Sequence, residues 1–192
     1  MKIIDEIHFV YGKLGAKNFV LPITENCKGK SIIYCQTAKD NFINTSEKIK
    51  DLPKWFNLKI SLNLNFIINF IPSCLYLYFF LSKNKNKKFI VHMNTFALFP
   101  LIIAKIAGVK KRIYFNHGFP FIDEKGHSRL ILYCIEFIDI LFATDVITVS
   151  PKQLCSLKND IITKLKDIRP IVPGSCCGIS TARIINLDKL RE

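Results

Sequence analysis

The sequence predicts an α/β protein built on an open parallel sheet with helices on both faces. Short apolar runs of strand length alternate with helix-length apolar segments along the whole 192-residue chain. The pattern is clearest at 89–118, FIVHMNTFALFPLIIAKIAGVKKRIYFNHG, where two such runs flank one helical segment closed by Gly108. Two parallel strands joined by a helix form the βαβ unit from which sheets of this class are built. A chain of this length suits one domain with a single core.

The expected elements follow in chain order. Strands are predicted near 7–10, 31–36, 58–64, 89–93, 112–116, 145–149 and 170–172. Helices are predicted from about residue 16, over 66–81, 96–107 and 128–142, and from the Ser150-Pro151 pair onward. Serine before proline favours a helix start, because serine can cap the first turn and proline at the first helical position loses no needed N–H.

The net charge of +13 favours anionic partners. Nucleic acid and an anionic membrane surface are both candidates. No nucleic-acid-binding module is recognisable, however, and the basic residues are not interleaved with aromatic ones, so nucleic acid is not expected as a partner. A second interpretation stays open, in which lysine is simply the usual solvated residue of a chain rich in Lys, Ile and Asn.

The cysteines and the N-terminus favour a reducing, cytoplasmic location. The seven cysteines are odd in number, scattered and without C-x-x-C spacing, so neither a disulfide framework nor a zinc site is indicated. Acidic Asp5 and Glu6 follow Lys2, and no long apolar core succeeds them, so a signal peptide is not expected.

One apolar run could contact a membrane. Residues 66–81, FIINFIPSCLYLYFFL, fall short of the ~20 residues needed to span hydrocarbon, and they include Asn69 and Pro72. The flank at 82–88, SKNKNKK, would place lysines at anionic headgroups if this helix lay on a bilayer. A buried core helix and a surface-lying helix both remain possible interpretations.

Two histidines are the main site candidates, because His92 and His117 each end a predicted strand. Open α/β sheets bind ligands outside the carboxyl ends of their strands. If the two strands are parallel neighbours, these ends lie ~5 to 10 Å apart. Gly118 would let a ligand approach the backbone closely, and His117 should be able to exchange a proton near neutral pH. Asn94 and Thr95 add neutral hydrogen-bonding groups, or else simply cap the helix.

A glycine loop lies between the first predicted strand and helix. In GKLG, Gly12 and Gly15 could let backbone amides approach a phosphate, although an ordinary tight turn is the better interpretation of so short a motif. His8, just before the loop, is interpreted as a packed or surface histidine. No metal-ligand spacing, G-x-S-x-G or paired-carboxylate motif occurs, so no metal is expected.

Four segments together resemble one enzyme family. They are VHMNT (91–95), AKIAGVKKRIYFNHGFPF (104–121), VITVSPKQ (146–153) and PGSCCGIS (173–180). Their order and spacing are similar to those of the N-terminal, acceptor-side domain of bacterial family 4 glycosyltransferases, the GT-B enzymes that build capsule, O-antigen and exopolysaccharide chains. The resemblance implies a Rossmann-like domain over 1–185 and the start of an interdomain linker at 186–192. It also implies that the C-terminal donor-binding domain is absent.

The resemblance carries roles over to individual residues. It implies a catalytic role for His117, which is the residue expected to meet the transferred sugar or the acceptor. Cys177 stands where the family usually has Asn, and Ser180 where it usually has Asp. The residues that the resemblance implies in substrate binding are Gly12, Gly15, His92, Asn94, Thr95, Gly118, Ser150 and Gly178.

The implied activity is transfer of a sugar from a nucleotide sugar, in this family typically a UDP-sugar, to a lipid-linked saccharide acceptor. The nucleotide sugar is a substrate and no cofactor is expected. The implied location is the inner face of the bacterial cytoplasmic membrane. Because the donor-binding half is missing, the chain alone is expected to be inactive, whether it is a truncated product or a subunit with a separate partner. The alternative function is a non-catalytic, membrane-associated subunit that positions a separately encoded catalytic partner.

Overall fold

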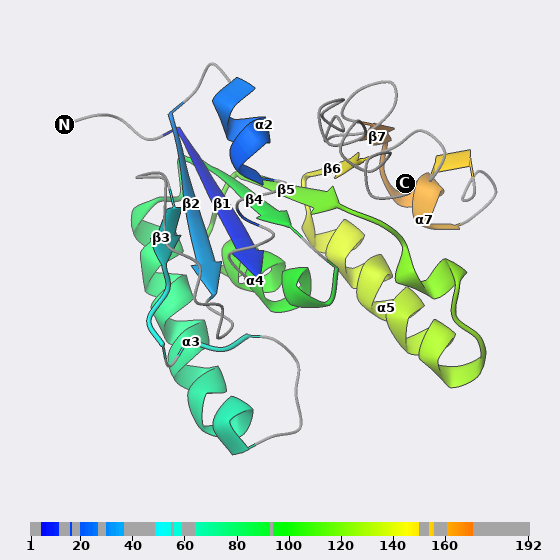
Figure 1. Cartoon of the computed structure of the whole chain (residues 1–192), viewed down its shortest axis with the longest axis horizontal. Coiled ribbons are helices and arrows are strands. Elements are labelled where there is room, and N and C mark those ends of the chain that lie inside the picture. Colours follow the sequence, from blue (N-terminus) through cyan, green and yellow to red (C-terminus); the bar gives the residue numbers. More distant parts are fainter. Residues whose placement is uncertain are drawn as a thin grey trace, which may run out of the picture.

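The chain folds around a seven-stranded, fully parallel open sheet, as the sequence predicts (Figure 1). The computed structural model describes residues 5–11, 16, 20–26, 30–36, 49–54, 56–58, 64–92, 94–149, 154–155 and 161–170. In chain order the strands are β1 (Glu6–Tyr11), β2 (Ser31–Gln36), β3 (Ile49–Asp51), β4 (Lys88–His92), β5 (Lys111–Asn116), β6 (Asp145–Thr148) and β7 (Ile168–Pro170). Their order in the sheet is β3-β2-β1-β4-β5-β6-β7, the Rossmann-like arrangement with one further strand at its edge.

Helices cover both faces of this sheet. The helices are α2 (Leu21–Asn26), α3 (Leu64–Lys83), α4 (Asn94–Ile106), α5 (Gly126–Phe142) and α7 (Ile161–Leu165), with a short 3-10 helix η2 (Pro120–Ile122) before α5. Figure 1 shows α3, α4 and α5 side by side below the sheet and α2 on the opposite side. The expected α/β architecture is therefore confirmed.

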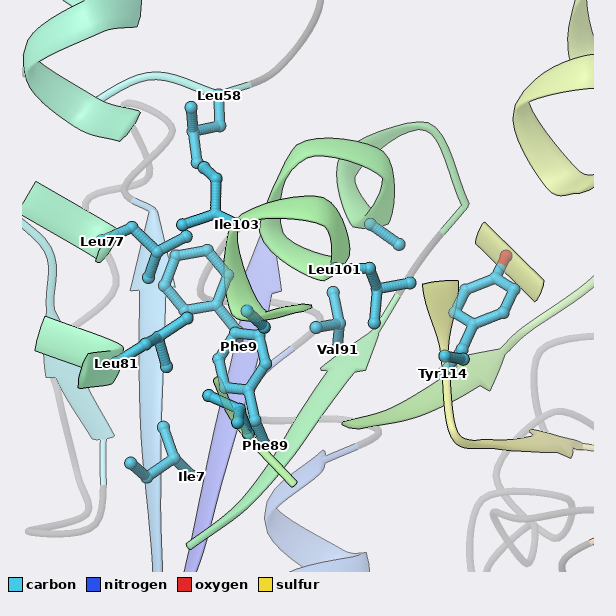
Figure 2. Packing of buried hydrophobic residues seen from close by; sticks show 14 of the residues in the cluster. Ile7, Phe9, Leu58, Leu77, Leu81, Phe89, Val91, Leu101, Ile103 and Tyr114 are labelled. Atoms are coloured by element: carbon cyan, nitrogen blue, oxygen red, sulfur yellow. The ribbon is translucent and has the colours of Figure 1, made fainter. Parts of the chain in front are cut away.

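The alternation of side chains along each strand explains why both faces are apolar. Phe9, Phe89 and Val91 point toward α3 and α4, where they pack with Leu77 and Leu101 in the main core (Figure 2). The intervening strand positions point to the α2 side, where a smaller cluster joins Ile90, Ile113 and Phe115 to Ile23 of α2. Polar residues on this second face are consequently buried in the middle of the sheet.

A left-handed glycine ends α4 and starts the approach to β5. Gly108 has a φ of 77°, which is accessible to glycine at little steric cost. The amide of Val109 then donates to the carbonyl of Ala104 at 3.0 Å, which closes the last turn of the helix. This turn fixes the point where β5 begins, and therefore where its carboxyl end lies.

Three sequence-based boundaries differ from the structure. The third strand is β3 at 49–51. Of the strand predicted at 58–64, residues 59–63 lie outside the described residues, and its two ends do not fit, because Leu58 lies outside any strand and Leu64 already belongs to α3. Leu58 is fully buried against the main core, so its apolar character reflects an anchored loop rather than strand alternation. The last strand begins at Ile168 instead of at Pro170. The helix predicted from about residue 16 agrees with the described residues, because Ala16 and Val20 are π-helical and α2 follows at once.

Candidate active site

The site lies where the strand order reverses. From β1 the chain proceeds outward to β2 and β3 on one side, then returns to β4 on the other side of β1. In open α/β sheets, ligands bind outside the carboxyl ends of the strands at such a switch point. His8 of β1 and His92 of β4 belong to the two strands that flank it, and His117 directly follows β5.

The three histidines form one continuous contact across the sheet. Nδ1 of His8 lies 3.0 Å from Nε2 of His92, and Nδ1 of His92 lies 3.3 Å from Nε2 of His117. The ring centroids are 5.3 Å and 5.5 Å apart, and Phe115 stacks on His92 at 4.9 Å. The strand register explains the geometry, because His8 pairs with Ile90, and His92 lies two residues further along the same face of β4.

Burial increases from the outer ring to the inner ones. His92 and His8 are only 0% and 1% exposed, whereas His117 is partly exposed. The prediction that His92 and His117 lie close together at a sheet edge is therefore met by the structure. His8 is packed, as one of its two interpretations expects, and its ring is also hydrogen-bonded to His92.

Desolvation governs the charge state of His92 and His117. Burial lowers the pKa of His117 to about 4 and lowers the pKa of His92 well below its usual value, and the neighbouring imidazoles lower the pKa of His92 further. Both rings are therefore neutral at pH 7. The expectation that His117 titrates near neutral pH is wrong, because the residue is largely desolvated.

A carboxylate lies at the inner end of the histidine chain. Oε2 of Glu6 is 3.8 Å from Nε2 of His8, and Oε1 of Glu6 accepts a hydrogen bond from the ammonium of Lys88 at 2.8 Å. The adjacent imidazole of His8 and then Lys88 hold the pKa of Glu6 at about 2 against the opposing effect of burial. Nε2 of His8 makes no hydrogen bond within the described part of the chain.

Asn116 clamps the backbone of the turn that carries His117. Its carbonyl oxygen accepts a hydrogen bond from the amide of Gly118 at 2.7 Å, while its amide nitrogen donates to the carboxyl group of Glu136 on α5. The hydroxyl of Tyr114 donates to the second oxygen of Glu136 at 3.1 Å. The end of β5 is thus tied to α5 on the face opposite to the histidine chain, which fixes the backbone on both sides of His117.

The acid in this clamp is neutral. Burial raises the pKa of Glu136 to about 8, although Tyr114 and Asn116 act in the other direction by hydrogen bonding to the carboxylate. Burial, followed by the nearby Glu136, raises the pKa of Asp139 one turn further along α5 well above its usual value. Among the described residues, neither carboxyl oxygen of Asp139 has a hydrogen-bond partner. The two groups therefore favour their protonated forms.

The remaining site candidates are not brought together by the described structure. Gly118 lies next to His117 and is partly buried. Asn94 and Thr95 form the first turn of α4, directly after the end of β4, as predicted. Four candidates lie outside the described residues: Gly12, Gly15, Ser150 and Gly178.

Sequence reasoning missed Glu6, His8, Asn116 and Glu136. A parallel sheet brings Glu6 beside Lys88 and His8 near His92 across 82 and 84 residues of chain, and no local pattern encodes that register. A polar residue inside an otherwise apolar strand was the available signal for His8 and Asn116. An acid on the apolar helix that follows β5 was the corresponding signal for Glu136.

A separate hollow of about 520 Å³ lies at the opposite edge of the sheet. It is bordered by the first residues of β4, β5 and β6, which are Lys88, Lys111 and Asp145, and by residues around β7. Its cations face oxygen atoms of the protein. Lys111 pairs with Asp145, Arg169 with Asp167 and Lys88 with Glu6, while Lys166 donates to carbonyls at the end of α5. We therefore place the candidate site at the histidines. In the described part of the chain, no cluster of His, Cys, Asp and Glu could hold a metal ion.

Comparison with known proteins adds no family assignment. No model of a known protein family and no curated protein sequence matches the chain. The structural statements about the site therefore depend on the geometry alone.

The protonated state of Glu136 predicts how stability depends on pH. The pKa of this group is raised to about 8 from a usual 4.5, so the folded state keeps a proton that the unfolded state loses between these values. The free energy of unfolding therefore falls as pH rises through this window. Glu136→Gln removes the effect, so its stability relative to the wild type should rise from pH 4.5 to 8, by at most about 1.4 kcal/mol per pH unit. Urea denaturation across this range measures it.

The same substitution at Glu6 supplies a comparison of opposite sign. The pKa of Glu6 is lowered to about 2, so its ionised form stabilises the protein above pH 4.5, and this contribution disappears as pH falls toward 2. Glu6→Gln should therefore be less stable than the wild type at neutral pH and approach it in acid. A flat stability difference for Glu136→Gln between pH 4.5 and 8 would contradict a neutral Glu136.

Proposed function

We propose that this chain supplies the acceptor-side half of a bacterial family 4 glycosyltransferase that extends lipid-linked saccharides. The observation that carries the proposal is the partly exposed imidazole of His117, backed by buried His92 at the switch point of a Rossmann-like sheet. A neutral imidazole held at this edge suits a hydrogen bond to an acceptor hydroxyl. The resemblance of residues 85–185 to the acceptor-side domain of this family favours the same role.

The other half of the reaction belongs to a second lobe. In a GT-B enzyme that lobe binds the nucleotide sugar, here a UDP-sugar. Its cations and a helix N-terminus stabilise the departing diphosphate. On this proposal His117 contacts the acceptor, and the second lobe closes over the carboxyl edge of the sheet. Gly12 and Gly15, which match the glycine loop of that family, would approach the acceptor or the donor diphosphate through their backbone amides.

The outer face of α3 favours attachment to a membrane. Ile68, Ile71, Leu75 and Phe79 are each more than half exposed, and their spacing of three and four residues places them on one side of the helix. Lys83, four residues further along, continues the same side, and Lys85 and Lys87 follow. We call this stripe of apolar residues ending in lysines the α3 stripe. No described helix is both long and apolar enough to cross a bilayer.

Charge distinguishes the α3 stripe from another apolar surface. On α5, Leu130, Ile131 and Leu141 are also exposed, but charges of both signs flank them, Asp123 and Glu124 beside Lys125 and Arg129. The α3 stripe instead ends in cations only, which complements the anionic inner leaflet of a bacterial membrane. A helix that lies flat in the headgroup region would bring the acceptor-side lobe to a lipid-linked substrate at the inner membrane face.

The enzymatic proposal predicts a large effect of His117→Ala. In a membrane preparation where the chain is co-expressed with its donor-binding partner or continuation, transfer should fall by on the order of 10² or more, the scale of a lost hydrogen-bonding group at the reacting centre. Incorporation of sugar from a panel of radiolabelled nucleotide sugars into the lipid fraction measures this. The exposed His127 supplies the matched control, and His127→Ala should leave transfer unchanged.

Two outcomes would count against this proposal. Unchanged transfer by His117→Ala would show that His117 is structural. A wild-type chain that binds membranes and a partner, but is dispensable for transfer by that partner, would favour the alternative of a non-catalytic subunit that positions a separate enzyme.

The membrane proposal predicts which surface residues control vesicle binding. Replacing Ile71, Leu75 and Phe79 together by Gln should weaken binding to vesicles of phosphatidylcholine and phosphatidylglycerol by on the order of 10²-fold, because each apolar side chain contributes about 1 kcal/mol or more when buried. Lys83→Gln and Lys85→Gln should each weaken it by about fivefold, and only when the anionic lipid is present. Sedimentation with vesicles measures both effects.

The α5 surface provides the control for general hydrophobicity. A variant with Gln at Leu130, Ile131 and Leu141 removes three apolar groups of similar exposure from the other surface. It should bind vesicles as the wild type does. Equal loss of binding in the two triple variants, or stronger binding to DNA or RNA than to anionic vesicles, would contradict the assignment of the α3 stripe.

A further inference from the structure

The histidine chain has only two possible arrangements of its protons. His92 lies in the middle and uses both ring nitrogens, Nε2 toward His8 and Nδ1 toward His117. A neutral imidazole has one N–H and one lone pair, so His92 must donate to one neighbour and accept from the other. With all three rings neutral, either all carry their proton on Nε2 or all carry it on Nδ1.

The two internal contacts do not choose between these arrangements, because each provides the same number of N–H···N hydrogen bonds. The choice is made by the surroundings of the outer nitrogens. In the first arrangement Nε2 of His8 carries a hydrogen that faces the carboxylate of Glu6 at 3.8 Å. In the second arrangement a lone pair would face that carboxylate, which is electrostatically unfavourable in a poorly solvated place.

Glu6 is well placed to hold its negative charge. It is 8% exposed, its Oε1 accepts from the ammonium of Lys88 at 2.8 Å, and the hydroxyl of Ser31 donates to its Oε2 at 3.4 Å. The carboxylate therefore acts as a fixed negative end for the row of imidazoles, which continues from β1 through β4 to the end of β5.

We propose that Glu6 holds all three histidines in the Nε2–H form, so that His117 keeps an unprotonated Nδ1 and can accept a proton that is relayed inward to His8. Glu6, His8 and His92 are positioning residues in this proposal, because only His117 lies near the outer edge. The tautomer assignment depends on the geometry alone, whereas its use in a reaction rests on the proposed transferase function.

The relay conserves protons and charge. As an acceptor hydroxyl forms its bond to the anomeric carbon, the bond from that carbon to the diphosphate breaks and its electron pair leaves with the diphosphate. The hydroxyl proton passes to Nδ1 of His117, the Nε2 proton of His117 to Nδ1 of His92, and the Nε2 proton of His92 to Nδ1 of His8. His8 then carries both protons as an imidazolium beside the Glu6 carboxylate. The positive charge ends at an existing anion rather than on the desolvated His117.

Long-range ¹H–¹⁵N NMR of the chain labelled at histidine nitrogens tests the assignment directly, because protonated and unprotonated ring nitrogens resonate in separate ranges. Single substitutions of His117 and His127 identify the signals of these two residues, and the two sets of signals that remain belong to His8 and His92. At neutral pH we expect His8, His92 and His117 in the Nε2–H form. The Nδ1–H form at any of the three in the wild type would overturn the proposal, whatever the outcome of transfer assays.

Two substitutions at one ion pair separate the carboxylate from its cation. Glu6→Met removes the charge and should let the Nδ1–H form appear in all three rings. Lys88→Met breaks the same ion pair but keeps the carboxylate, so the Nε2–H form should persist. Glu6→Gln, which keeps the shape of the side chain and can either donate or accept, should populate both forms if Glu6→Met does not fold. Pure Nε2–H signals in the folded Glu6 variant would overturn the role of Glu6.

Discussion

The contact between the rings of His8 and His92 is the interaction on which the site depends, because it joins the two strands that flank the switch point of the sheet. The Nδ1 to Nε2 distance of 3.0 Å places a polar hydrogen bond within an otherwise apolar layer. Parallel pairing of β1 with β4 sets this distance, and the pairing of β4 with β5 extends the row to His117. A change of register by one residue would turn a histidine to the opposite face and break the row.

Buried polar groups on the two faces of the sheet differ in their charge state. On the α2 side, the three imidazoles contact one another across three strands and Glu6 is paired with Lys88, so a charge is retained at the inner end. On the α5 side, Glu136 and Asp139 are buried and favour their neutral forms, and Glu136 accepts hydrogen bonds from Tyr114 and Asn116. Both sets of contacts reach the short turn after β5, through His92 to His117 and through Asn116 to Gly118. Burying polar groups without partners is unfavourable, so the orientation of His117 is fixed from both sides.

Much of the fold could be predicted from sequence, because strand and helix periods alternate clearly between 89 and 149. The strands that end at His92 and Asn116, the helix between them and the parallel pairing were all foreseeable from local pattern. The two ends of the strand predicted at 58–64 did not fit, since an apolar residue such as Leu58 that packs into the core from outside any strand looks the same in sequence as a strand residue. The site was predictable only as far as strand ends identify it. Glu6 and His8 enter it through contacts over more than 80 residues, and the low pKa of His117 follows from burial that a sequence does not state.

The central claim is that three imidazoles form one hydrogen-bonded row at the switch point. Scalar coupling between ¹⁵N nuclei across N–H···N hydrogen bonds reports such contacts directly. The account predicts two couplings at neutral pH, one between Nδ1 of His8 and Nε2 of His92 and one between Nδ1 of His92 and Nε2 of His117. Absence of both couplings in the folded protein, with the histidine signals resolved and slow to exchange with water, would contradict it.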